Sequence, residues 1–160
     1  MSNVATSPVV ISADAFLAYW QGHRRLTRRV IAAFPADEFG TLSIGGMRPF
    51  SAIAAELLGM AVPTAQGVLT GEWKEYAVAK LTSQADILKA WDESTAELDR
   101  IFPQIPMERF QETITAFGQW TMPGHDLFLY VIDNEIHHRG QGYVYLRALG
   151  IEPPHFWERS

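Results

Sequence analysis

The chain has 160 residues, the usual size of one folded domain, and it is long enough to bury a core without a metal or a disulfide. Its 13 basic and 18 acidic side chains give a net charge of −5, so no nucleic-acid partner is expected, because such proteins normally carry a basic surface. The absence of cysteine excludes a thiol nucleophile, a cysteine-ligated zinc, an iron–sulfur cluster and a disulfide.

Targeting and membrane signals are weak. No uninterrupted apolar run approaches the ~20 residues that a membrane span needs, so no membrane partner is expected. Residues 1–8 have neither the basic nor the apolar segment of a secretory signal, which predicts a cytoplasmic protein. We expect residues 1–11 to form a flexible N-terminal arm and residues 12–160 to form one domain.

Hydrophobic periodicity predicts a first helix that begins after Ser12, a good N-terminal cap. Apolar residues recur every three or four positions until Pro35 ends this helix. Residues 36–49 hold three glycines and a proline, and we expect them to form a loop.

Two more helices are predicted in the middle of the chain. Ser51 is expected to cap the second helix, Pro63 to kink or break it, and Gly71 to end it. Ser83 is expected to cap the third helix, which continues to Pro103.

The last third of the chain combines an irregular segment with a long helix. Residues 107–123 lack the helical period and alternate weakly, which predicts a short strand or an ordered loop. The last helix is predicted from about His125 to Leu149, with Gly150 as its C-cap. Four long helices without a convincing sheet predict an all-α bundle with an irregular segment before the last helix.

Three consecutive core-facing positions of the last helix are polar, namely Asn134, His138 and Gln141. Burying such groups without partners costs roughly 1–3 kcal/mol each, so something must satisfy them. Asn134 and His138 are four residues apart on one face, which lets two side chains share one metal or one water. The alternative is a hydrogen-bonded polar cluster between helices.

Other residues of the last helix carry separate expectations. Gly140 and Gly142 each cost about 1 kcal/mol relative to alanine, which predicts close approach of a neighbouring backbone or a ligand. Glu135 and Arg139 are expected to form an exposed ion pair of little energetic weight. His137 lies off the polar face and is expected at a helix or subunit contact.

The last helix resembles the signature helix of the DinB-like (DNA-damage-inducible, YfiT-related) superfamily, through NEIHHRGQ at residues 134–141 and YLRALGIEPP at residues 145–154. The order of segments fits over most of residues 12–157. The resemblance implies an antiparallel four-helix bundle, usually a homodimer, with a divalent metal held by three histidines. Members include thiol-dependent S-transferases and hydrolase-like enzymes.

Only one of the three histidines implied by this resemblance is present. His138 matches the second histidine of the last helix, Asn134 stands where the first would be, and Glu56 takes the place of the second-helix histidine. The resemblance therefore implies a site for nickel, zinc or manganese formed by Glu56, Asn134 and His138. This set should bind zinc or nickel less tightly than three imidazoles, because asparagine is a weak ligand.

The leading interpretation is a divalent-metal-dependent enzyme, a thiol S-transferase or hydrolase-like, which acts on a small molecule such as a thiol. One alternative is a non-enzymatic dimeric binding or stress-response module whose Glu/Asn/His triad is a structural polar cluster. Another is a metal-independent acid–base enzyme that uses Glu56 and His138. We expect His23 to be a core histidine rather than a ligand, and Trp73 and Trp120 are candidates to roof the site.

Overall fold

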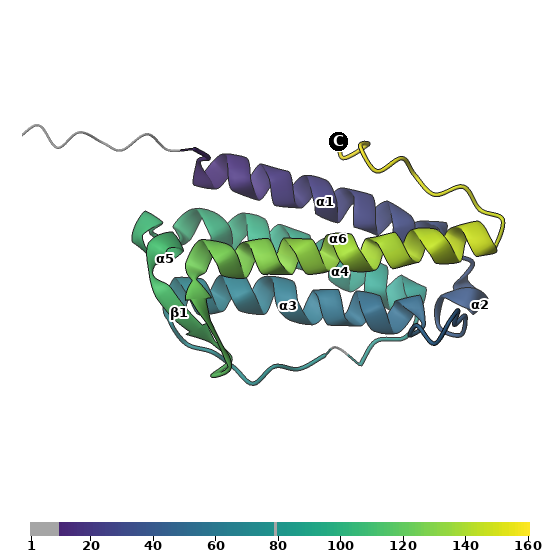
Figure 1. Cartoon of the computed structure of the whole chain (residues 1–160), viewed down its shortest axis with the longest axis horizontal. Coiled ribbons are helices and arrows are strands. Elements are labelled where there is room, and N and C mark those ends of the chain that lie inside the picture. The colour runs from purple at the N-terminus through teal and green to yellow at the C-terminus, as the bar shows by residue number, and fades with distance from the viewer. Residues whose placement is uncertain (1–9, 79) are drawn as a thin grey trace, which may run out of the picture.

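The structure is a computed structural model and describes residues 10–78 and 80–160 (Figure 1). Its main body is a bundle of four long helices, α1 (Ala13–Ala33), α3 (Phe50–Thr70), α4 (Gln84–Ile101) and α6 (Gly124–Ala148). The shorter elements are α2 (Ala36–Phe39), the 3-10 helix η1 (Phe102–Gln104), α5 (Met107–Gln111), β1 (Thr113–Ala116) and β2 (Trp120–Pro123). The predicted helical bundle is confirmed.

Three of the predicted helix ends are confirmed in detail. The Ser12 hydroxyl accepts the backbone N–H of Ala15 in α1 at 3.1 Å, and the Ser83 hydroxyl accepts that of Asp86 in α4 at 3.1 Å. Gly71 ends α3 in a left-handed conformation with φ of 77°, which glycine adopts without steric cost.

The start of α3 differs from the prediction, and the break that was one of two outcomes expected at Pro63 is not found. The helix begins at Phe50, directly after Pro49, and Ser51 is buried inside it rather than capping it. The helix also runs unbroken through Pro63, because the residues on either side of this proline, such as Ala61 and Ala65, are packed in the core.

The two segments without helical periodicity contain short elements. The predicted loop at 36–49 includes α2, whose Phe39 is fully buried and holds the segment to the core. Residues 107–123 form α5 and an antiparallel hairpin in which Ile114 pairs with Met122. The predicted ordered segment is therefore a helix followed by a hairpin, which leads directly into α6.

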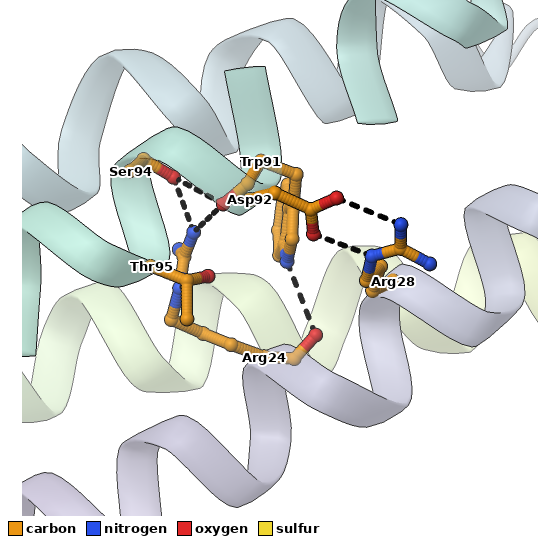
Figure 2. Close-up of polar contacts among 6 residues, drawn as sticks. All are labelled: Arg24, Arg28, Trp91, Asp92, Ser94 and Thr95. Atoms are coloured by element: carbon orange, nitrogen blue, oxygen red, sulfur yellow. Dashed lines mark hydrogen bonds and ion pairs between the residues drawn. The ribbon is translucent and has the colours of Figure 1, made fainter. Parts of the chain in front are cut away.

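Two arginine side chains of α1 contact α4, one buried and one at the surface (Figure 2). The Arg24 side chain is 1% exposed, and its guanidinium donates to the Trp91 carbonyl at 3.3 Å and lies 4.3 Å from the Trp91 ring centroid. Arg28 forms an ion pair with Asp92 at 2.5 Å (Figure 2). These contacts fix α1 against α4.

The expected N-terminal arm is only partly described. Residues 1–9 of the expected arm lie outside the described residues, and Ile11 is exposed.

By length and composition alone α3 would pass as a membrane span, the one such helix among the described residues. Just over half of its apolar window (56%) is buried inside the bundle, as in the core helix of a packed domain.

Candidate functional site

The three predicted site residues meet between α3 and α6. His138 Nε2 lies 3.2 Å from Glu56 Oε1, and Asn134 Nδ2 lies 3.4 Å from the same oxygen. Their side chains are only partly accessible, with 20% of Glu56 and 11% of His138 exposed. The shared face predicted for Asn134 and His138 therefore points at Glu56.

Gln141, the third polar residue of that face, contacts the other side of the His138 ring. Its amide oxygen lies 2.7 Å from His138 Nδ1, and in this arrangement Nδ1 carries a proton, because an amide oxygen only accepts. The lone pair of Nε2 would then face the Glu56 carboxylate at 3.2 Å. The lone pair and the negatively charged carboxylate oxygen repel each other. A second proton or a cation between these two atoms removes this repulsion.

Arg48, which no sequence pattern indicated, completes the site. Its Nη1 donates to Glu56 Oε2 at 2.5 Å, so both carboxylate oxygens of Glu56 have partners. The Tyr145 hydroxyl of α6 donates to the Arg48 carbonyl at 2.7 Å and holds this segment in place. Arg48 lies in the glycine-rich segment before α3, where no periodicity indicates which side chain faces the site.

The charge state of Glu56 follows from these partners. Partial burial alone would raise the pKa of Glu56, but the hydrogen bond and positive charge of Arg48 act in the opposite direction, and Asn134 and His138 add to them. The pKa of Glu56 is therefore below its ordinary value. At neutral pH the carboxylate is ionised.

These donors fit a tightly held transition metal poorly. Glu56 is already paired with Arg48, whose positive charge opposes a nearby cation. Asn134 turns its NH₂ group toward Glu56 and toward Met60 Sδ at 3.2 Å, so its amide oxygen does not face the shared point. Among residues 10–78 and 80–160, no group of three His, Asp or Glu side chains is placed to hold a metal ion. Metal binding by Glu56, Asn134 and His138 stays a prediction.

A cavity of about 290 Å³ lies beside Glu56, between α3, α6 and the hairpin. Glu56 is the one charged residue among the described residues that line it. The other lining side chains are mainly aromatic or thioether groups, including Met60, Tyr76, Phe117, Trp120, Met122 and Tyr130. Trp120 thus borders this cavity, whereas Trp73 lines a neighbouring one. The cavity suits an apolar molecule with one polar end.

The side of α6 that faces α1 differs from the prediction. Glu135 and Arg139 are 2% and 5% exposed, so the expected exposed pair is wrong. Glu135 Oε1 lies 2.6 Å from the Thr27 hydroxyl, and Arg139 donates to that same hydroxyl oxygen at 3.1 Å. Both residues are buried because α6 packs against α1 on this side as well as against α3.

His23 belongs to this second polar cluster and not to the candidate site. Its Nδ1 lies 3.1 Å from Arg139 and its Nε2 lies 2.9 Å from Arg159. Burial, Arg139 and Arg159 together lower the pKa of His23 to about 4. The expected core histidine is confirmed as buried, but arginines are its side-chain partners.

The other predictions for α6 concern its two glycines, Gly140 and Gly142, and His137. A Cβ at Gly142 would lie 2.7 Å from the Phe50 ring, so the close neighbour is a side chain rather than a backbone or a ligand. A Cβ at Gly140 would meet no atom of residues 10–78 and 80–160 within 4 Å, so no backbone among these residues approaches it, and close approach of a ligand stays a prediction. His137 is exposed on α6.

Comparison with known proteins agrees with this architecture. The DinB family model matches residues 1–160. A DinB-like protein from Bacillus subtilis superposes with a TM-score of 0.71 at 22% identity, covering 91% of this chain and 99% of that chain. A DinB-like protein from Bacillus cereus ATCC 10987 gives a TM-score of 0.70 at 20% identity, covering 90% and 97%. A mycothiol-dependent maleylpyruvate isomerase gives 0.64 at 15% identity, covering 81% and 60%. No curated protein matches the chain in sequence.

Proposed function

The chain belongs to the DinB family, and we propose that it is a metal-independent enzyme that binds an apolar small molecule beside Glu56. The Glu56–His138 pair would supply the acid–base chemistry. The observation that carries this proposal is the ion pair between Arg48 and Glu56, which gives the carboxylate a permanent cationic partner.

Each residue of the site has a role in this proposal. Glu56 is the group that borders the cavity, so it accepts a proton from the bound molecule. His138 Nε2 lies 3.2 Å from the carboxylate oxygen Oε1, close enough to pass that proton on. Gln141 holds the other ring nitrogen and fixes the orientation of the imidazole. Arg48 and Asn134 keep the carboxylate in position.

The cavity supports the proposed class of ligand. Its volume of about 290 Å³ and its aromatic and thioether walls favour a compact apolar body. The single carboxylate at its edge favours a ligand that carries one protic group.

A second candidate is a metal-dependent thiol S-transferase or hydrolase-like enzyme. Two observations favour it: the predicted metal-site residues converge on Glu56 Oε1, and the fold is similar to that of a mycothiol-dependent maleylpyruvate isomerase. Under this alternative, Glu56 and His138 would hold a divalent metal, which would supply Lewis-acid chemistry.

The test begins with a panel of small molecules screened for thermal stabilisation of the tag-free protein. Each molecule that binds is then assayed for conversion by mass spectrometry with and without a chelator. Our proposal predicts conversion that survives the chelator and is lost in His138→Asn and Glu56→Gln, while binding remains. Conversion that stops with the chelator and returns with added metal would support the second candidate. Binding without conversion of any molecule would support a binding module.

A further inference from the structure

One wall of the cavity comes from residues 72–78, which follow α3 and return along its outside (Figure 1). We call residues 72–78 the strap. Two glycines of α3 seat it, because a Cβ at Gly67 would lie 2.5 Å from the Trp73 ring and a Cβ at Gly59 would lie 2.8 Å from the Ala77 carbonyl oxygen. The strap can lie this close to α3 only because Gly59 and Gly67 have no side chains.

Tyr76 lies between these two seats and lines the same cavity as Glu56. Its ring packs edge-on against Phe117 of the hairpin turn, with 5.8 Å between ring centroids. Burial and the charge of Glu56 raise the pKa of Tyr76, with Arg48 opposing them. The Tyr76 hydroxyl therefore keeps its proton and acts as a hydrogen-bond donor at neutral pH.

Tyr76 and Glu56 line the same cavity and carry complementary polar groups. The phenol hydroxyl donates, whereas the ionised carboxylate only accepts. A ligand hydroxyl both accepts and donates, so it matches the two groups together. Tyr130 also borders the cavity, but it is 53% exposed and lies at the rim, in contact with water.

We propose that Tyr76 determines specificity in this pocket and selects small aromatic alcohols or phenols, whose hydroxyl accepts from Tyr76 and donates to Glu56. The apolar ring of such a ligand packs among Phe117, Trp120 and the methionines. This inference rests on the ligand pocket of the proposed function and adds the class of molecule that the pocket selects.

Binding of p-cresol and toluene to the tag-free full chain tests the inference, because the two probes differ by one hydroxyl. Titrations followed by NMR chemical shifts should show p-cresol binding roughly five- to tenfold more tightly than toluene, as expected for hydrogen bonds to polar groups of the pocket. Tyr76→Phe should reduce this ratio several-fold and leave toluene binding unchanged. Tyr19→Phe, at a 44% exposed tyrosine of α1, is the matched control and should keep the wild-type ratio.

A second variant tests the strap without changing Tyr76. Gly67→Ala should displace Trp73 and the strap, and should lower the p-cresol to toluene ratio as Tyr76→Phe does. Gly140→Ala, where a Cβ meets nothing within 4 Å, should leave it unchanged.

The outcomes separate this inference from the proposed function. If neither probe binds the wild-type protein, the pocket is not a site for such ligands and both proposals fail. If both probes bind but the wild-type ratio is near one, or Tyr76→Phe keeps the full ratio, the role of Tyr76 is wrong and the pocket stands.

Discussion

At the scale of single residues, Glu56 is the centre of the site because its two carboxylate oxygens have different partners. Arg48 holds Oε2, while His138 and Asn134 share Oε1. A carboxylate with an arginine at hydrogen-bond distance stays ionised to lower pH than an isolated one. Arg48 therefore sets the charge state on which the proposed chemistry depends.

Arg48→Met tests this dependence, because methionine keeps much of the length and removes the charge. The pKa of Glu56 should rise in this variant, since burial then acts with less opposition. Carboxyl carbon NMR shifts across a pH titration measure it. Lys89→Met, at a residue of α4 whose side chain is 77% exposed, is the control and should leave the Glu56 titration unchanged. An unaltered titration in Arg48→Met would show that the ion pair does not set the charge state.

His23 provides a pH-dependent test of the second polar cluster. Its pKa of about 4 in the folded protein lies below the ordinary 6.5, so the unfolded chain binds a proton more readily. Its contribution to stability is complete above about pH 6.5 and is lost as the pH falls toward 4. Urea unfolding at pH 7.5 and 5 should therefore show a smaller loss of stability on acidification in His23→Gln than in the wild type.

The matched control for this experiment is His137→Gln, at an exposed histidine of α6. This variant should lose stability on acidification as the wild type does. Equal pH dependence in His23→Gln and the wild type would contradict the burial of a neutral His23 between Arg139 and Arg159.

At the scale of elements, α6 carries a polar cluster on each of two sides. Asn134 and His138 face α3, whereas Glu135 and Arg139 face α1. A helix between two neighbours needs partners for polar groups on both sides, because an unpaired buried charge is costly. This central position explains why Glu135 and Arg139, which were expected on the solvent-facing side, are buried.

The two glycines of α6 give a paired prediction of stability. Gly142→Ala should destabilise the fold by about 1–3 kcal/mol, because the new methyl group overlaps the Phe50 ring and Val30. Gly140→Ala should stabilise it by roughly 0.5–1 kcal/mol, because alanine favours the helix and meets no neighbour. Urea unfolding measures both. A similar change of stability in the two variants would contradict the packing of α6 on α3.

Local patterns in the sequence predicted those parts of the site that lie on helices. Polar residues at helical spacing on an apolar stripe indicated that Asn134, His138 and Gln141 share a face, and the family resemblance added Glu56. Arg48 and Tyr76 come from extended segments whose paths depend on distant contacts, namely with Tyr145 and with the glycines of α3. Hydrophobic periodicity in a short stretch of sequence does not indicate such distant contacts. Neither Arg48 nor Tyr76 was therefore identified from the sequence.

At the scale of the whole molecule, the bundle brings together residues far apart in the chain. The cavity draws its wall from α3, the strap, the hairpin and α6. Elements that are irregular in sequence, above all residues 107–123, thus form part of the candidate site. The hairpin turn places Phe117, in a left-handed conformation with φ of 53°, at the cavity.

We also propose that the chain forms a homodimer, as the resemblance implied. Gly142 of α6 is packed against Phe50 inside the bundle and is not available for this interface. Tyr19, Met107 and Leu129 instead line a groove at the surface and are 40–50% exposed. Sedimentation at micromolar concentration should give twice the chain mass of 18.0 kDa, and Leu129→Glu should shift the protein toward monomer. A wild-type monomer at high concentration would contradict the proposal.

Zinc titration calorimetry tests most directly whether Glu56 and His138 form a metal-independent pair. The tag-free wild type at about 10 μM should give no one-site binding isotherm, whereas Asn134→His should gain affinity because it adds an imidazole donor. Stoichiometric zinc binding by the wild type that is lost in His138→Ala would contradict a metal-independent pair.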